Sequence, residues 1–172
     1  MYAGLDSGDI AILEAIEGDA RQPFNQLAER VGLSKTPCWN RVQAMENAGV
    51  IEGYRTAVDP LALGLGQRAF LQVSVDFEYY EAFEQAIVAH PAVVDCHAVA
   101  GEADYLLQVI SSDVSRLDSL LRRDLSRLPG VKRFSTTICM KAIKRDGSIT
   151  AAARFAAAQE HATSSTRHKR RR

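Results

Sequence analysis

The chain has 172 residues, of which 47% are apolar and 24% charged, proportions that are ordinary for one soluble domain or two small ones. No apolar run approaches the roughly 18 residues that mark a membrane-spanning helix. The first residues lack the basic and apolar parts of a secretory signal. We therefore expect a cytoplasmic protein that does not use a membrane as a partner.

The net charge of zero conceals an uneven distribution along the chain. Residues 1–60 contain five Lys or Arg against nine Asp or Glu, which gives a net charge of −4. Residues 61–146 contain ten against eleven, and residues 147–172 contain six against one, which gives −1 and +5. Nucleic-acid-binding domains usually carry a basic surface, so the acidic first segment argues against DNA binding there.

The cysteines give no sign of a metal site. Cys38, Cys96 and Cys139 lie far apart among apolar residues, so we expect them to be small buried side chains. Neither they nor the four histidines have the spacing of zinc ligands. We expect no metal and no cofactor.

Residues 1–60 predict three short helices. Asp6 is a candidate N-cap for the first helix, and apolar residues then recur at helical spacing up to Ile16. Pro23 suits the first position of a second helix, which Gly32 ends. Ser34 can cap a third helix. Its inner face carries three residues at helical spacing, Cys38, Val42 and Met45.

The segment after the third helix predicts a strand and then a domain boundary. Val50–Ile51 and Tyr54–Val58 have the β-branched and aromatic content of a strand. Asp59-Pro60 breaks the chain, and two glycines follow within six residues. We therefore expect a helix-turn-helix domain over residues 1–60 and a linker over residues 61–66.

Residues 67–146 predict a second domain of strands and helices. Strands are expected at Ala69–Val75, Val93–Val99, Tyr105–Ile110 and Val131–Ile143. Helices are expected at Phe77–His90 and at Val114–Leu128. The resulting βαββαβ order is ferredoxin-like, and the whole chain is then of the α+β class. Such a sheet carries both helices on one face, so the uncovered face favours dimerisation.

Residues 147–172 form an alanine-rich and then basic extension. Ala151–Ala158 predicts a short helix, and the following run to Arg172 is expected to be disordered. Its basic end, Arg167–Arg172, has two interpretations: solvation of the chain end, or nonspecific attraction to phosphates.

The second and third helices have the spacing of a helix-turn-helix, in which the later helix enters the major groove. Its outer face carries Asn and Gln, which suit adenine, and Thr, which suits a thymine methyl or a base edge. Glu46 is an acid in this region, and any three-helix unit could produce such a pattern. The candidate DNA-binding residues are Ser34, Lys35, Thr36, Pro37, Trp39, Asn40, Arg41 and Gln43.

Five sequence segments together resemble the Lrp/AsnC (leucine-responsive/asparagine-synthase regulator) family. They are Leu5–Leu13, Leu27–Val42, Gly49–Tyr54, Gly101–Leu107 and Leu128–Val131. The resemblance spans Leu5 to Lys144, with the motifs in the same order across both domains. It implies an N-terminal winged helix-turn-helix, a C-terminal domain that senses amino acids, and assembly into dimers and octamers.

The resemblance also implies an effector site between dimers. Its residues would be Gly101, Glu102, Ala103, Asp104 and Tyr105, with Thr136 and Thr137 on the far wall. Free N–H groups of this turn could hold an α-carboxylate, and the Asp104 carboxylate could pair with an α-ammonium group. The alternative is an ordinary hairpin turn. The family often has Asp where Glu102 stands, which leaves the ligand specificity open.

We expect a sequence-specific DNA-binding transcription regulator that responds to an amino acid or related metabolite. Its partners would be double-stranded DNA, the effector and further copies of the chain. The alternative is a ligand-binding and oligomerisation module without DNA-binding activity, which the charge of residues 1–60 favours. An enzyme is disfavoured, because no nucleophile with a base, phosphate loop or metal motif is present.

Overall fold

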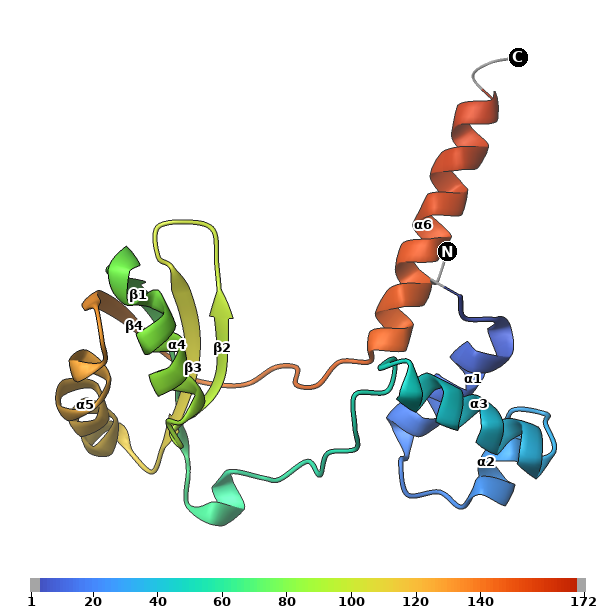
Figure 1. Cartoon of the computed structure of the whole chain (residues 1–172), viewed down its shortest axis with the longest axis horizontal. Coiled ribbons are helices and arrows are strands. Elements are labelled where there is room, and N and C mark those ends of the chain that lie inside the picture. Colours follow the sequence, from blue (N-terminus) through green and yellow to red (C-terminus); the bar gives the residue numbers. More distant parts are fainter. Residues whose placement is uncertain (1–3, 170–172) are drawn as a thin grey trace. The chain divides into compact units, whose positions relative to one another are not determined.

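The computed structural model describes residues 4–169, with side chains up to residue 159 (Figure 1). The chain divides into two compact units. Unit 1 comprises Met1–Thr56 together with Lys144–Arg172, and unit 2 comprises Ala57–Ile143. From the sequence we expected separate parts over residues 1–60, 67–146 and 147–172; in the structure residues 57–60 cluster with unit 2, and residues 144–172 cluster with unit 1.

Unit 1 begins with three helices, as the periodicity predicted: α1 (Ser7–Gly18), α2 (Phe24–Arg30) and α3 (Lys35–Asn47). Their apolar sides form one core, and each large side chain in it contributes about 1.5–3 kcal/mol through burial. The core residues are Ile12, Ala15, Leu27, Ala28, Cys38, Val42 and Met45. The predicted inner face of α3 is therefore confirmed.

The start of α1 is fixed by a capping box. The Asp6 carboxylate accepts hydrogen bonds from the backbone N–H groups of Gly8 and Asp9, at 2.8 and 2.9 Å. The Asp9 carboxylate in turn accepts from the Asp6 N–H at 3.0 Å. These bonds satisfy N–H groups that have no partner within the helix. The predicted N-cap at Asp6 is confirmed.

The strand expected at Val50–Ile51 and Tyr54–Val58 is wrong for this chain, because these residues have no regular secondary structure. A strand needs a neighbouring strand to pair its N–H and C=O groups. Every strand that the structure describes belongs to unit 2, so this segment has no such neighbour within unit 1. Gly49 directly follows the C-cap of α3 with a left-handed φ of 71°, a conformation that favours glycine.

Unit 2 has the predicted βαββαβ order. Its elements are β1 (Gln67–Val75), α4 (Tyr80–Val88), β2 (Val93–Ala98), β3 (Tyr105–Ser111), α5 (Val114–Arg123) and β4 (Val131–Ile138). Short 3₁₀ helices accompany them at Leu61–Leu63, Phe77–Tyr79 and Leu125–Arg127. The strands form one antiparallel sheet in the order β2-β3-β1-β4.

Strand β4 is shorter than expected, since it ends at Ile138 rather than Ile143. It is an edge strand of the sheet and pairs with β1. Ile138 is opposite Ala69, and the next backbone bond, from the Cys139 N–H to the Arg68 carbonyl, measures 2.9 Å. Because β1 begins at Gln67, it offers almost no further partners to the residues after Cys139.

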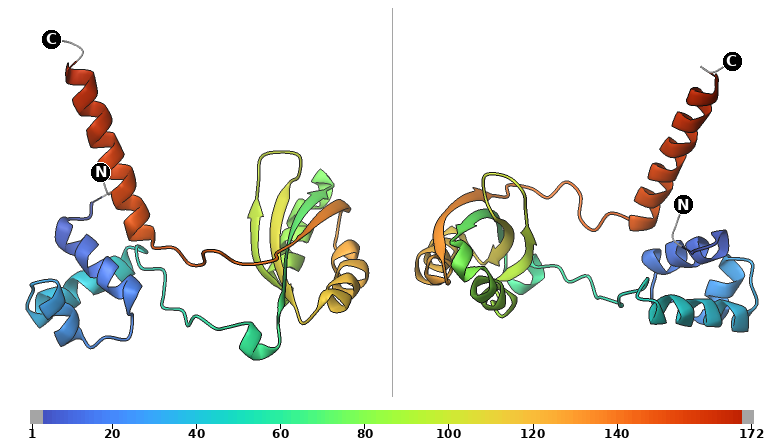
Figure 2. Two further views of the ribbon diagram at one scale, coloured as in Figure 1. Left: turned by 180° about the vertical axis from the view of Figure 1, so that it is seen from behind. Right: turned by 45° about the horizontal axis from the view of Figure 1, so that its top comes forward.

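Both helices of unit 2 cover one face of the sheet, as predicted (Figure 2). Alternate residues of β1 and β3 point into the core between the sheet and the helices, where Phe83 of α4 and Leu117 of α5 meet them. The residues between them, such as Phe70 and Leu106, lie on the other face and are only partly buried. This open face carries no helix among the described residues.

The C-terminal extension differs from its prediction. A single helix, α6, runs over Ile149–Lys169, where a short helix followed by disorder was expected. Alanine has the highest helix propensity, and the segment contains neither Gly nor Pro to end the helix. Residues 170–172 lie outside the described part. No described helix combines the length and apolar character needed to cross a bilayer.

Gly130 provides a test of how tightly unit 2 is packed. Its φ is 69°, and an added Cβ would lie 2.5 Å from the Tyr79 Cβ and 3.0 Å from the Val75 Cγ1. The Gly130→Ala substitution should therefore lower the free energy of unfolding by about 2–4 kcal/mol in urea denaturation. As a control, Gly18→Ala meets no neighbouring atom of the described residues and should be close to neutral. Equal midpoints for the two variants would contradict this packing.

Candidate DNA-binding and effector sites

Helix α3 presents most of the predicted DNA-binding residues to solvent. A turn through Gly32, whose φ is 70°, separates it from α2. Ser34 is its N-cap, without a side-chain capping bond. Six of the eight candidates are exposed, namely Ser34, Lys35, Thr36, Pro37, Trp39 and Asn40. The inner face of α3 is buried in the core, so the outer face is free to contact a ligand as large as DNA.

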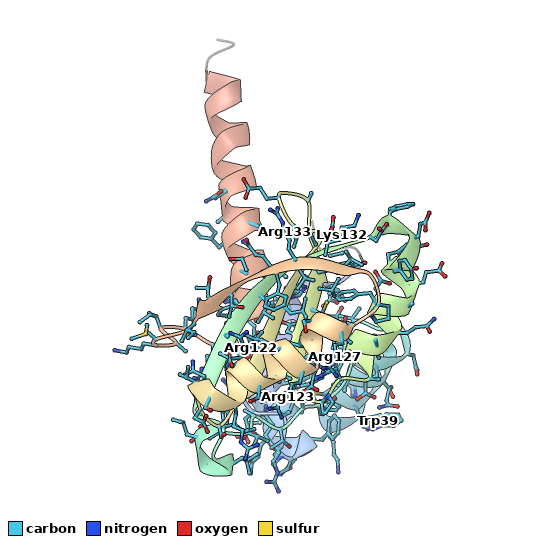
Figure 3. All side chains as sticks on the ribbon, turned by 90° about the vertical axis from the view of Figure 1, so that its left-hand side faces the viewer. Trp39, Arg122, Arg123, Arg127, Lys132 and Arg133 are labelled. Atoms are coloured by element: carbon cyan, nitrogen blue, oxygen red, sulfur yellow. The ribbon has the colours of Figure 1, made fainter. Side chains whose placement is uncertain are left out.

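Trp39 is the largest exposed side chain on α3. Its side chain, labelled in Figure 3, is 48% exposed. It follows Cys38, which is fully buried, so the ring lies at the margin between the buried and the outer face. The indole ring is therefore accessible to a partner, as is the exposed side chain of its neighbour Asn40.

Arg41 is held within unit 1. Its guanidinium forms ion pairs of 2.7 Å with both Asp6 and Asp9, at the start of α1. The hydrogen bond from Arg41 lowers the pKa of Asp6, and the two carboxylates raise the pKa of Arg41. The contact fixes the middle of α3 against the first turn of α1. The expected role of Arg41 in DNA binding stays a prediction, and a contact with DNA would have to share the guanidinium with two carboxylates.

The last candidate, Gln43, is also engaged. Its amide donates to one carboxylate oxygen of Glu46, and the Tyr54 hydroxyl donates to the other at 2.7 Å. Partial burial and the bond to Glu46 raise the pKa of Tyr54 to about 12. The Gln43 amide and the Tyr54 hydroxyl thus compensate the negative charge of Glu46 on the outer side of α3. The sequence alone did not explain how an acid is accommodated there.

The turn expected to bind the effector is tied to the end of β1 by Asp104. Its carboxylate accepts from the Val75 N–H at 2.9 Å, and its own N–H donates to the Val73 carbonyl at 3.0 Å. The Glu102 carbonyl accepts from the Arg133 guanidinium at 3.3 Å. Asp104 therefore has a structural role, and its second carboxylate oxygen has no hydrogen bond within the described residues.

Tyr105 is a core residue with one polar contact. It is 7% exposed, and its ring packs against Phe83 with centroids 4.8 Å apart. Its hydroxyl donates to the Glu84 carboxylate at 2.8 Å. Burial and this hydrogen bond raise the pKa of Tyr105 to about 12. Its ring edge can form a wall of a site, while its hydroxyl is already engaged.

A cavity of about 270 Å³ lies beside this turn. Its lining residues are Val75, Asp76, Phe77, Tyr80, Ala98, Val99, Asp104 and Tyr105. Pockets for drug-sized ligands occupy roughly 300–1,000 Å³, so this one suits a smaller metabolite. Of the predicted effector residues, only Asp104 and Tyr105 line it. Gly101, Glu102 and Ala103 belong to the adjoining turn but not to the lining.

The part of the cavity that follows β1 was not predicted from the sequence. Lys132 lies on β4 (Figure 3) and forms an ion pair of 3.2 Å with Asp76. The hydrogen bond from Lys132 lowers the pKa of Asp76. Phe77 is 85% exposed and contacts Tyr80, with ring centroids 5.7 Å apart. An acid followed by exposed aromatic residues at the end of a strand was the available signal.

Thr136 and Thr137 do not form one wall. Thr136 is opposite Leu71, whose side chain is buried beneath the helices, and Thr137 is opposite Phe70 on the open face. Successive residues of a strand point to opposite faces, so the two side chains face different environments. Neither lines the cavity. Their expected role at an effector site between dimers stays a prediction, although within one chain only one of the two can face a given ligand.

The two units together define a class of protein. Unit 1 is a three-helix unit with an exposed polar face on its third helix, and unit 2 is a ferredoxin-like unit with a small cavity. Residues 5–52 match the winged helix-turn-helix DNA-binding family, and residues 68–149 match the Lrp/AsnC ligand-binding domain. This combination defines ligand-responsive transcription regulators. The chain belongs to the Lrp/AsnC family.

Relatives support the assignment along most of the chain. The proline dehydrogenase transcriptional activator of Rhizobium radiobacter is 38% identical over 146 residues, 83% of this chain and 94% of the relative. The leucine-responsive regulatory protein of Escherichia coli K12 is 34% identical over 148 residues, 84% of this chain and 90% of the relative.

Solved structures give the same result. A transcriptional regulator of Neisseria meningitidis in complex with L-Met has a TM-score of 0.79 at 33% identity, covering 82% of this chain and 93% of that one. An AsnC family regulator of Agrobacterium tumefaciens has a TM-score of 0.79 at 29% identity, with coverages of 84% and 96%. The winged helix-turn-helix and α+β classes expected from the sequence are confirmed.

The contact of Arg41 with α1 predicts a pH-dependent stability difference. The pKa of Asp6 is lowered from 3.8, so its pairing with Arg41 stabilises the fold above that pH, and the stabilisation is lost as pH falls through the lower folded pKa. Arg41→Ala should lower the melting temperature at pH 7, and the difference should shrink below about pH 4. Arg30→Ala serves as a control. A deficit independent of pH would contradict the ion pairs.

Proposed function

We propose that the protein is a cytoplasmic, homo-oligomeric regulator without enzymatic activity. It binds specific DNA sequences through the outer face of α3, and an amino acid bound to unit 2 changes its assembly or its affinity for DNA. The observation that carries the proposal is the exposed polar face of α3 in a segment matching a DNA-binding family. Effector binding would act by stabilising one assembly over another.

The exposed residues of α3 differ in the part of DNA that each can contact. Thr36 and Asn40 lie one helical turn apart, so both can reach base edges in the major groove. Lys35 is exposed at the start of α3 and suits a phosphate. Gln43 can reach a base only if its bond to Glu46 breaks. We therefore assign the main base contacts to the first two turns of α3.

Asn40→Ala tests this interface directly. The substitution removes a bidentate contact to a base, so affinity for DNA from the upstream region of the protein's own gene should fall about tenfold or more. The fold should be unaffected because Asn40 is exposed. A gel shift measures the affinity. The control is Gln85→Ala, which removes an exposed amide from α4 in unit 2. Equal binding by both variants would refute the assigned face.

For the effector, the cavity favours a small amino acid with an apolar side chain. Its lining combines apolar and aromatic residues with the carboxylates of Asp76 and Asp104. The free oxygen of Asp104 can pair with an α-ammonium group. The turn at Gly101–Ala103 adjoins the cavity without lining it, so its N–H groups can hold the α-carboxylate of a ligand that extends from the cavity toward the turn. The regulator of Neisseria meningitidis that was solved with L-Met gives a precedent for such a ligand.

Asp104→Asn separates the binding role of this residue from its structural one. An asparagine oxygen still accepts from the Val75 N–H, so the fold should be retained, but the charge that pairs with an ammonium group is removed. Amino-acid affinity should fall about tenfold or more in calorimetric titration. Asp113→Asn is the control, because Asn is an equally good N-cap for α5. Equal amino-acid affinity in the two variants would exclude the proposed pairing of Asp104 with the ammonium group. If the wild-type protein binds none of the common amino acids at millimolar concentration, the sensor role is refuted.

Self-association follows from the open face of the sheet. Phe70 and Leu106 lie there beside polar residues, and none of the described helices covers them. A second copy would bury this face, so a dimer is the minimum assembly that we propose. The octamer implied by the family resemblance would join dimers around the turn at Gly101–Tyr105, which places the effector at a site that controls assembly.

A ligand-binding module without DNA affinity is the second candidate. The specific observation in its favour is the net charge of −4 in residues 1–60. The two functions differ in their salt dependence, because phosphate contacts give a steep fall of affinity with salt. Absence of salt-dependent binding to the upstream region would favour the second candidate.

A further inference from the structure

The charges of unit 2 are divided between two stretches of the chain. Residues 61–113 contain one Lys or Arg against eight Asp or Glu, which gives a net charge of −7. Residues 114–133, which form α5, the 3₁₀ helix after it and the start of β4, contain six against two, which gives +4. The core of unit 2 does not require this separation, because charged side chains take no part in it.

The inner side of α5 fixes where its arginines lie. Leu117 and Leu120 are buried in the core that the helices share with the sheet, and so is Leu125 of the following 3₁₀ helix. Arg116 and Arg123 are seven residues apart, or about two helical turns, so they lie on one side of α5 and about 10 Å apart along its axis. Both are exposed. The buried leucines thus leave a row of cations facing solvent.

The basic surface of unit 2 consists of the four exposed arginines of this stretch. They are Arg116, Arg122, Arg123 and Arg127. Figure 3 shows the last three on α5 and on the turn that follows it. Arg122 pairs with Asp118 at 2.8 Å. The other three form no ion pair with another residue in the described part of the chain, so their guanidinium groups are available to a partner.

The remaining two cations of the stretch are engaged elsewhere. Lys132 pairs with Asp76 at 3.2 Å, and the Arg133 guanidinium donates to the Glu102 carbonyl at 3.3 Å. The basic surface is therefore limited to the helical side of unit 2. This side stays accessible when a second copy covers the open face of the sheet, because the helices lie on the opposite face.

Helix stability accounts for only part of this pattern. Arg122 and Arg123 lie in the last turn of α5, where cations interact favourably with the helix dipole. Arg116 lies in the first turn, where the dipole disfavours a cation, and Arg127 lies beyond the end of α5. The N-cap Asp113, whose carboxylate accepts from the Arg116 N–H at 2.8 Å, compensates the first of these charges in part. A binding role explains both positions.

The residue type and the spacing indicate the partner. All four cations are Arg, whose planar guanidinium presents a fork of N–H donors that matches two oxygens of a phosphate. A small anion would need donors that converge on one point, whereas arginines spread along a helix suit an extended polyanion. DNA is such a polyanion, with one negative charge for about every 1.7 Å of its axis.

We propose that the basic surface of unit 2 is a second DNA-contacting surface, which binds the phosphate backbone independently of sequence. It rests on the proposed DNA-binding function and gives unit 2 a role in DNA affinity beside its role in sensing an amino acid. The outer face of α3 supplies discrimination between sequences. The arginines of unit 2 supply the electrostatic attraction that residues 1–60, with a net charge of −4, lack.

The direct test removes three charges from the basic surface in the full-length chain and leaves Arg122 with its ion pair. The surface variant carries Arg116→Gln, Arg123→Gln and Arg127→Gln. The control variant removes the same charge from exposed residues that follow β4, by Lys141→Gln, Lys144→Gln and Arg145→Gln. Fluorescence anisotropy measures the affinity for DNA over a series of salt concentrations.

The slope of log affinity against log salt should become shallower in the surface variant. The change should be about 0.9 for each phosphate that is no longer neutralised, with a ceiling of about 2.7 for three cations, and the control should stay close to the wild type. Affinities for upstream and unrelated DNA should fall by the same factor, because phosphate contacts carry no sequence information. Asn40→Ala should instead reduce the preference for upstream DNA.

A slope in the surface variant equal to that of the wild type would overturn the second surface and leave the proposed function intact. Equal changes in the surface and control variants would also overturn it, because net charge alone would then explain the effect. A wild type that binds no DNA would overturn both proposals.

The alternative partner of the basic surface is the acidic stretch of a second copy, residues 61–113. Sedimentation velocity without DNA distinguishes it. The surface variant should form the same assemblies as the control variant if the arginines bind DNA. Smaller assemblies in the surface variant would show that the arginines join copies of the chain, and would contradict the proposal.

Discussion

The burial of the inner face of α3 is the constraint on which the DNA-binding unit depends. Cys38 and Val42 are fully buried and Met45 is nearly so, which leaves α3 no freedom to rotate about its axis. The opposite side must then face solvent with its polar residues. Arg41 adds a second restraint through Asp6 and Asp9, so one set of core contacts and one ion-pair group orient the whole reading surface.

The periodicity of apolar residues in the sequence was sufficient to predict most of the fold. The three helices, the βαββαβ order and the inner face of α3 all follow from apolar spacing and from Gly and Pro positions. The predicted strands were wrong where strand formation depends on a neighbouring strand, because the spacing of apolar residues does not show which strands pair. The segment after Gly49 has strand-like residues but no strand beside it within unit 1, and β4 ends where β1 stops offering partners.

The sites were harder to predict than the fold because they join distant residues. Asp76 and Phe77 meet Asp104 only because β1 and β3 are neighbours in the sheet, so no local motif connects them. Likewise, the contact of Glu17 with Thr150 spans 133 positions. Composition predicted the helical tendency of the alanine-rich extension, but only its anchor on α1 shows that it belongs to unit 1.

Ion pairs and hydrogen bonds of acidic residues connect the three N-terminal helices of unit 1 with α6. Residues 1–60 are acidic, yet several of their acids are already paired, with Arg41, Arg154 or the start of α6. We propose that this unit reads DNA under the control of an amino acid. Genome-wide mapping of bound sites, with and without amino-acid supplementation, tests it most directly. We expect discrete sites that share a sequence and change in occupancy with the amino acid. Uniform signal along the chromosome, or occupancy indifferent to every amino acid, would contradict it.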